Sequence, residues 1–280
     1  MSPRFQLLAA LSILLWAAGC SQPSPEAAGG TPTPGVSPEK KEEIRLNEWN
    51  LSSFFPSNNG TFIIRSLRTN QSYVFNETRA ALREAPQSTF KVANALIGLQ
   101  TGAVQDENTV KRWDGVKRSR EIWNQDHTLA TAMRHSTVWY YQAMARDIGN
   151  ERMQQWLDAI DYGNKDISGG IDKFWNNSSL KISPMEEVEF ITKLVQESLP
   201  FDKKVMQTVK QMIREEEQQP GYTLYGKTGG SSNPPFGWYV GFVQLQEDTL
   251  VFAAQVDGES GTLNKAKDIT KLVLKERLLP

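Results

Sequence analysis

Residues 222–257 read YTLYGKTGGSSNPPFGWYVGFVQLQEDTLVFAAQVD, and this stretch decides the fold class. Its β-branched, aromatic and aliphatic runs are separated by Gly, Ser, Asn and Pro or by an acidic pair, which is the pattern of strands joined by turns. We therefore predict three neighbouring strands over Tyr222–Lys227, Gly237–Gln246 and Thr249–Asp257. Glu247 and Asp248 are expected to form the turn between the last two.

A second group of strands is predicted near the other end of the chain. Thr61–Leu67 and Ser72–Asn76 flank a polar turn and indicate a hairpin. The sequence between the two groups has helical spacing, over Ser88–Gln100, Asp126–Ile148, Glu151–Ile160, Met185–Glu197 and Lys203–Glu217. A last helix is expected over Asn264–Leu279. Strands from both ends with helices from the middle predict an α+β fold with one antiparallel β-sheet.

Composition excludes several classes of function. The chain has 280 residues, of which 39% are hydrophobic and 10% aromatic, so a sizeable core is expected. Its 31 basic and 32 acidic residues leave a net charge of −1, which argues against a nucleic-acid partner. With two His and one Cys, neither a His/Cys metal site nor a disulfide framework is expected.

The first 40 residues are predicted to be a targeting segment and a tether. A basic start, an apolar run over Phe5–Ala18 and small residues before Cys20 are typical of a bacterial lipoprotein signal. We expect residues 1–19 to be removed and Cys20 to carry lipid. An ordinary secretory signal that leaves a free thiol is the alternative. Residues 20–40, rich in Pro and Gly, predict a flexible tether, and residues 41–280 are expected to form the catalytic domain.

Four short motifs in this domain carry reactive side chains. In the first, Ser88-Thr89-Phe90-Lys91 opens an apolar helix and places a lysine one turn after a serine. Serine is a poor nucleophile without an adjacent base, and a neutral lysine at this spacing accepts its proton. A helix-capping serine beside a solvated lysine is the alternative. Two other Ser-x-x-Lys sequences, which start at Ser37 and Ser178, do not open an apolar helix.

The second motif, Lys227-Thr228-Gly229, follows the run that ends at Gly226. A lysine at a strand edge supplies a fixed positive charge, and glycines allow a substrate to lie along the backbone. The N–H of Gly230 is a candidate donor to an oxyanion, together with that of Ser88. A plain lysine at a strand-to-turn junction is the alternative.

The third and fourth motifs are Ser136-Thr137-Val138 and Tyr162-Gly163-Asn164. A hydroxyl near the nucleophile, here that of Ser136, can pass a proton to a leaving nitrogen, and a buried helical serine is the alternative. Tyr-Gly-Asn indicates a turn. His135 is next to Ser136, but adjacent residues of one helix point about 100° apart, so we interpret His135 as structural.

Together and in this order, the four motifs resemble those of the class D β-lactamases, the oxacillinase family of serine-reactive, penicillin-recognising proteins. Trp113-Asp114-Gly115, Ile167–Trp175 and Trp238–Gly241 match as well, and the resemblance covers roughly residues 45–280. It implies an antiparallel sheet with helices on both faces and a mainly helical subdomain, with the active site between them. It also implies hydrolysis of the β-lactam amide bond of penicillin-type antibiotics, which confers resistance.

The resemblance further implies a role for each motif. Ser88 attacks the β-lactam carbonyl and becomes the acyl-ester, while Ser136 relays a proton to the ring nitrogen and Lys227 polarises Ser136. Lys91 carries a carbamate made from CO2, supported by Val138 and Trp175, and no other cofactor is implied. The implied substrate-binding residues are Ser136, Lys227, Thr228, Gly229, Gly230 and Lys265.

Two departures from the family pattern bear on this reading. Residue 139 is Trp, where many members have Pro and sensor-type relatives have Trp. Near the C-terminus, many members have an Arg that binds the substrate carboxylate, whereas this chain has Lys265 and Lys267, either of which would serve as a point charge.

Two other functions fit the same motifs: a β-lactam sensor that stays acylated, and a penicillin-binding enzyme that acts on peptidoglycan. A solute-binding lipoprotein would explain the tether but not four ordered motifs. The expected partners are β-lactam molecules and, through Cys20, a membrane, with the oligomeric state left open. The expected location is the cell envelope, on the periplasmic side of the outer membrane in a Gram-negative host, or otherwise the periplasm or the medium.

Overall fold

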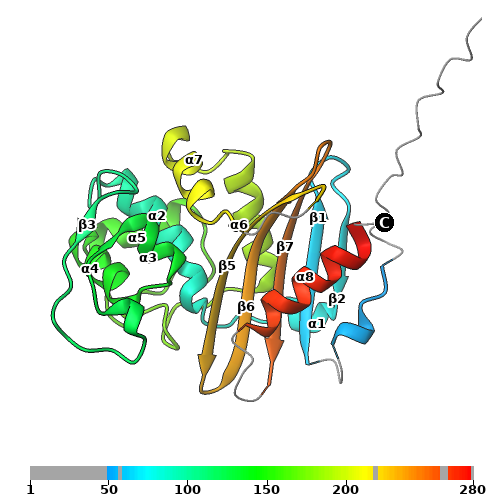
Figure 1. Ribbon diagram of the computed structural model, residues 1–280, viewed down its shortest axis with the longest axis horizontal. Helices are drawn as coiled ribbons and strands as arrows, with labels where there is room; N and C mark the ends of the chain where they lie inside the picture. Colours follow the sequence, from blue (N-terminus) through cyan, green and yellow to red (C-terminus); the bar gives the residue numbers. More distant parts are fainter. Residues whose placement is uncertain (1–48, 56–58, 217–219, 259–263, 279–280) are drawn as a thin grey trace, which may run out of the picture. The chain divides into compact units, whose positions relative to one another are not determined.

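An antiparallel sheet of five strands lies at the centre of the folded domain (Figure 1). Across the sheet the order is β2 (Ser72–Phe75), β1 (Gly60–Ser66), β7 (Thr249–Asp257), β6 (Pro235–Gln244) and β5 (Thr223–Ser232). Because β1 pairs with β7, the prediction that strands from both ends of the chain form one sheet is confirmed. The predicted hairpin is β1 with β2, which pair antiparallel with Ile64 opposite Tyr73.

The structure is a computed structural model that describes residues 49–55, 59–216, 220–258 and 264–278. All of these belong to one unit of the chain, Ile44–Pro280. The predicted signal segment (1–19), Cys20, the tether (20–40) and the charged segment up to residue 48 lie outside the described residues.

Each face of the sheet packs against its own core, because side chains of a strand alternate between faces. On β1, Phe62 and Ile64 belong to the cluster that α8 (Lys265–Leu278) covers, and Ile63 belongs to the cluster on the other face. That other face receives α6 (Pro184–Val195), which begins with a capping box between Ser183 and Glu186. The predicted α+β class with helices on both faces is therefore confirmed.

The remaining long helices gather beside the β5 edge (Figure 1). They share one apolar cluster with the α6 face of the sheet, so burial of their apolar sides fixes them against it. These helices are α2 (Lys91–Gln100), α3 (Leu129–Arg134), α4 (Val138–Ile148), α5 (Asn150–Ala159) and α7 (Lys203–Met212). Shorter elements are η2 (Ser52–Phe54), α1 (Glu77–Ala80), η4 (Gln87–Phe90), β3 (Val110–Lys111), η5 (Glu121–Trp123) and β4 (His127–Thr128).

The predicted single helix over Asp126–Ile148 is wrong. Its first part is strand β4, and a capping box between Thr128 and Thr131 starts α3 only after it. Ser136 then adopts φ +55°, in the left-handed region, which ends α3 and separates it from α4. Periodicity did not detect this break because apolar residues continue on both sides of it.

Two further boundaries differ from the prediction. Strand β5 does not end at Lys227 but pairs with β6 as far as Ser232, so Lys227-Thr228-Gly229 lies in mid-strand. Helix α7 ends at Met212 instead of residue 217. The chain after it runs along β5, where Gly226 N–H donates to the Ile213 carbonyl and Glu215 N–H donates to the Leu224 carbonyl.

Candidate active site

Ser88 lies in the 3₁₀ turn η4, which leads directly into α2. Lys91 is the first residue of α2, and its Nζ lies 2.8 Å from Ser88 Oγ. The spacing in the sequence already brought the two side chains onto one face, as expected for residues three apart on a helix. Gln87 N–H donates to the Trp175 carbonyl at 3.0 Å, which holds the turn against the loop before α6.

The Lys91 amine is buried, and its surroundings disfavour its charged form. Its side chain is 1% exposed, and its Nζ lies 5.4 Å from the centre of the Tyr141 ring. Burial lowers the pKa of Lys91 well below its ordinary 10.5, and the charges of Lys227 and Arg120 lower it further. A neutral amine beside a serine hydroxyl accepts the hydroxyl proton, so the pair has the geometry of an activated nucleophile.

Ser136 and Lys227 come together from distant parts of the chain. Ser136 projects from the break between α3 and α4, and its Oγ lies 3.1 Å from Lys227 Nζ. Lys227 is 5% exposed, and its Nζ also donates to the Thr228 carbonyl at 2.9 Å. The pKa of Lys227 is lowered to about 7, mainly by burial and also by the charge of Lys267, while Glu215 acts in the opposite direction. The hydroxyl of Ser136 therefore faces an amine that titrates near neutrality.

Strand β5 passes directly against the turn that holds Ser88. A Cβ atom on Gly229 would lie 2.8 Å from the Pro86 carbonyl oxygen and 3.1 Å from the Thr89 nitrogen. A glycine is required here by the approach of two backbones, a reason that the sequence did not reveal. Gly230 follows on the same strand, half-buried, and pairs opposite Gly237.

Trp175 carries an unused hydrogen-bond donor in the buried region around Lys91. Its side chain is fully buried, its ring stacks on that of Phe90 with centroids 5.3 Å apart, and Phe90 directly precedes Lys91. Among the described residues, Trp175 Nε1 has no hydrogen-bond partner. Val138 is the first residue of α4, two residues after Ser136. A buried indole N–H without an acceptor calls for a polar partner.

Comparisons with known proteins agree with this geometry. A family model described as "Penicillin binding protein transpeptidase domain" matches residues 57–275. The chain is 53% identical over 249 residues to "Probable beta-lactamase YbxI" of Bacillus subtilis (strain 168), a match that covers 89% of this chain and 92% of the relative. This chain belongs to the class D β-lactamases. The solved structure of "Class D beta-lactamase BAT-2" is 51% identical with a TM-score of 0.81, and the match covers 85% of this chain and 99% of that one.

One relative of this β-lactamase is named as a regulatory protein and not as an enzyme. "Regulatory protein BlaR1" of Bacillus licheniformis is 35% identical over 240 residues, which is 82% of this chain and 40% of that protein. A regulatory protein is therefore among the relatives, beside the β-lactamases.

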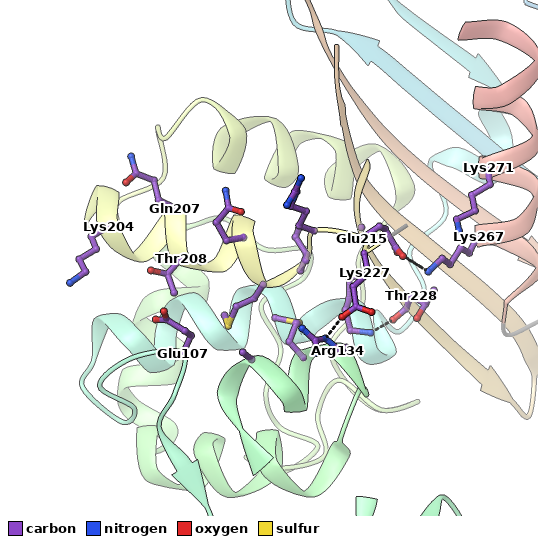
Figure 2. A pocket seen from close by; sticks show the side chains of 18 residues that line it. Glu107, Arg134, Lys204, Gln207, Thr208, Glu215, Lys227, Thr228, Lys267 and Lys271 are labelled. Carbon is purple, nitrogen blue, oxygen red and sulfur yellow. Dashed lines mark hydrogen bonds and ion pairs between the residues drawn. The ribbon is translucent and has the colours of Figure 1, made fainter. Parts of the chain in front are cut away.

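A cavity of about 790 Å³ opens beside the reactive residues of the β-lactamase (Figure 2). Lys227 and Thr228 line it, together with residues of α3, of α7 and of the segment after α7, whereas Ser88 and Lys91 are not among its lining residues. The cavity is therefore an extension of the reactive site along β5, not the place where the nucleophile lies.

The two lysines expected to bind a substrate carboxylate are placed differently. Lys265 is exposed at the start of α8 and does not line the cavity. Lys267 lines it, but its Nζ lies 2.7 Å from the carboxylate of Glu215 (Figure 2). Tyr239 O–H donates to the same carboxylate at 2.9 Å. Lys267 is therefore already paired with an anion.

Three residues near the site were missed from the sequence. Glu215 was hidden because it was assigned to a helix, although it lies on the segment that pairs with β5. Arg120 and Glu187 belong to no motif: the first is exposed on the loop before η5, and the second is 1% exposed on α6. Glu187 precedes the apolar Phe190, Ile191 and Leu194 by three, four and seven residues. This position of an acidic residue on the apolar face of a helix is the one signal in the sequence that pointed to it.

The two histidines lie on either side of α3. The ring of His127 lies 2.8 Å from the Ile122 carbonyl and 3.1 Å from the Thr131 hydroxyl, so both its nitrogens have partners. His135 ends α3, and its carbonyl accepts a hydrogen bond from Trp123 Nε1 at 2.9 Å. Within residues 49–278 as described, no three His, Cys, Asp or Glu side chains are grouped to hold a metal, and no helix has the length and apolarity to cross a membrane.

Proposed function

We propose that this class D β-lactamase hydrolyses the β-lactam amide bond of penicillin-type antibiotics through an acyl-enzyme on Ser88, and that it thereby confers resistance. The observation that carries the proposal is the contact of 2.8 Å between Ser88 Oγ and the buried amine of Lys91. The low pKa of Lys91 supports it, because only an unprotonated amine accepts the serine proton at neutral pH.

The proposed acylation uses two proton transfers. Ser88 Oγ bonds to the β-lactam carbonyl carbon while its proton passes to the base at Lys91. The ring C–N bond then breaks, and Ser136 donates its hydroxyl proton to the leaving nitrogen and regains one from Lys227. The backbone N–H groups of Ser88 and Gly230 would stabilise the oxyanion. Water then attacks the ester, releases the ring-opened acid and restores Ser88.

Thr228 and Gly229 complete the proposed substrate-binding edge of β5, beside Ser136 and Lys227. Because Gly229 has no side chain, Ser88 lies close to this edge. Lys265, exposed at the start of α8, is a further candidate for this edge as a point charge.

Lys91 is proposed to carry a carbamate formed from CO2. The residues around it fit such a group: burial lowers the pKa of the amine and so favours the neutral form that CO2 addition requires, and Trp175 Nε1 is a buried donor without a partner among the described residues. A carbamate would supply an anionic oxygen as the base in place of the amine nitrogen. Trp175 would hold it by a hydrogen bond, and Val138 would keep water from it.

The central experiment compares Ser88→Ala with Ser178→Ala, which alters another Ser-x-x-Lys sequence of the chain. We expect Ser88→Ala to abolish nitrocefin turnover and the covalent adduct that intact-protein mass spectrometry detects with a slow penicillin. Ser178→Ala should keep both. An adduct that survives on Ser88→Ala would refute the assignment of the nucleophile.

The same assay tests the sensor function, which the similarity to BlaR1 favours as a second candidate. An enzyme consumes many equivalents of nitrocefin for each protein molecule. A sensor or a transpeptidase releases one equivalent and then remains acylated. A single-turnover burst without steady-state turnover would therefore show that the protein is a sensor or a transpeptidase and not a hydrolase.

The carbamate has its own experiment. Protein equilibrated with ¹³C-bicarbonate should give a carbamate carbon signal that is absent in Lys91→Ala. Activity should fall on degassing at mildly acidic pH and return with bicarbonate, and Trp175→Phe should deepen this dependence. Full activity without CO2, together with no carbamate signal, would show that Lys91 acts as a free amine and carries no carbamate.

Export and anchoring are a separate proposal. We propose that residues 1–19 are a lipoprotein signal and that lipid on Cys20 holds residues 41–280 at the cell envelope through the tether. A single acyl chain anchors only weakly, so two or more chains on Cys20 are expected. Cys20→Ser should release the protein from the membrane fraction. Wild-type protein that fractionates as soluble would contradict lipidation.

A further inference from the structure

The guanidinium of Arg120 is held beside the residue that precedes Ser136. Its Nη1 donates to the His135 carbonyl at 3.4 Å, and its Cζ lies 5.0 Å from the centre of the Trp123 ring. Trp123 Nε1 donates to the same carbonyl at 2.9 Å, so ring and guanidinium are bound at one point of the backbone. The cation therefore has a defined position next to the reactive Ser136, although its side chain is exposed.

The charge of Arg120 acts on both reactive lysines. It lowers the pKa of Lys91 and that of Lys227, so its field reaches the two amines from the loop before η5. Lys91 and Lys227 flank the position of a bound substrate, since one contacts Ser88 and the other contacts Ser136. An anion bound in that position would be within reach of the same field.

Arg120 also differs from the neighbouring cations in its partners. Arg118 on the same loop forms an ion pair of 2.7 Å with Asp114, and Lys267 pairs with Glu215. Among the described residues, Arg120 has no carboxylate partner, and the His135 carbonyl is the sole acceptor for its five N–H donors. Its planar donor array matches a carboxylate, which can bind two of these N–H groups at once.

We propose that Arg120 is a specificity-determining residue that binds the carboxylate of the β-lactam substrate, in place of a cation from α8. The proposal rests on the proposed hydrolase function and names one of its substrate contacts. Lys267 is less suited to the role because its charge is neutralised by Glu215 at 2.7 Å, and a substrate carboxylate would have to displace that anion. Arg120 requires no such exchange, because it forms no ion pair among the described residues.

The test compares one substrate with and without its charge. Benzylpenicillin and its methyl ester share the reacting amide, but only the acid has a carboxylate for Arg120. We expect Arg120→Gln to lower kcat/KM for the acid about five- to tenfold, mainly through KM, the range for losing one partly solvated charge-assisted pair. The ester should change less than about twofold. Arg120→Lys should restore part of the acid's affinity, because it keeps the charge without the planar fork.

The matched control is Lys117→Gln, which removes one positive charge from an exposed position on the same loop. It should leave acid and ester unchanged. As a second measurement, kcat/KM for the acid should fall with rising ionic strength in the wild type and fall less in Arg120→Gln. Equal losses for acid and ester, no loss for the acid, or the same loss in Lys117→Gln would each overturn the proposal. Failure of the hydrolase function is distinguishable, because it would appear as absent nitrocefin turnover in the wild-type protein.

Discussion

Replacing Glu187 by Gln should remove a pH dependence from the stability of the protein. Glu187 Oε1 lies 2.8 Å from the Thr89 hydroxyl and 3.0 Å from that of Tyr162, and the side chain is buried. The Thr89 hydroxyl has one hydrogen but two acceptors at 2.8 Å, Glu187 and the Pro86 carbonyl. A protonated Glu187 satisfies all three groups, since it donates to Thr89 while Thr89 donates to Pro86.

The size of the effect follows from the pKa of Glu187. Burial raises this pKa from its ordinary 4.5 to about 7, against the opposing hydrogen bonds of Thr89 and Tyr162. The folded protein therefore holds a proton that the unfolded chain has lost between these two values. Stability from this source is complete below the unfolded pKa and is lost as the pH rises through the folded pKa, by about 2 kcal/mol between about pH 5.5 and about pH 8.

The assay is urea unfolding followed by Trp fluorescence across this pH range, for the wild type and for Glu187→Gln. The difference between their free energies of unfolding cancels the contributions of the other titrating groups. Across this pH range the difference should change by about 2 kcal/mol, with the wild type relatively more stable at low pH. Glu189→Gln, on the same helix but with a half-exposed side chain paired to Arg65, is the control and should show no such change. Parallel pH curves for wild type and Glu187→Gln would refute a protonated, buried Glu187.

Three further predictions concern the reactive site. Ser136→Ala should slow acylation about 10²- to 10³-fold in stopped-flow measurements, as loss of a proton relay does, and a weaker dissociation constant with an unchanged acylation rate would contradict this role. Gly229→Ala should lower the free energy of unfolding by about 1–3 kcal/mol and reduce kcat, because its Cβ would lie 2.8 Å from the Pro86 oxygen. Unchanged stability and kcat would show that β5 can shift to accommodate the methyl group. Glu215→Gln removes a charge that helps to keep the pKa of Lys227 as high as about 7, so this pKa should fall and the alkaline limb of kcat/KM should move to lower pH. An alkaline limb that does not move would show that it does not report the titration of Lys227.

Local patterns in the sequence predicted a large part of the fold and one half of the site. Runs of β-branched, aromatic and aliphatic residues between turn residues predicted β1, β2, β6 and β7, because such side chains pack well on the buried surface of a sheet. The contact of Ser88 with Lys91 was predictable for a similar reason, since three residues of helical backbone bring two side chains to one face. The resemblance to class D β-lactamases then joined motifs that no local rule connects.

The tertiary structure decided what depends on residues far apart in the chain. Ser136 meets Lys227 across 91 residues, and this requires the left-handed turn at Ser136 that helical periodicity does not detect. The fold also placed Glu215 against Lys267, one of the two cations expected to bind substrate, and left Arg120 without an acidic partner among the described residues. A charge near a site acts according to its burial and partners, and both are properties of the folded chain. The sequence by itself determined which reactive groups exist and which are neighbours along a helix, whereas only the fold decided which amines are buried, with a lowered pKa, and which cation remains for a ligand.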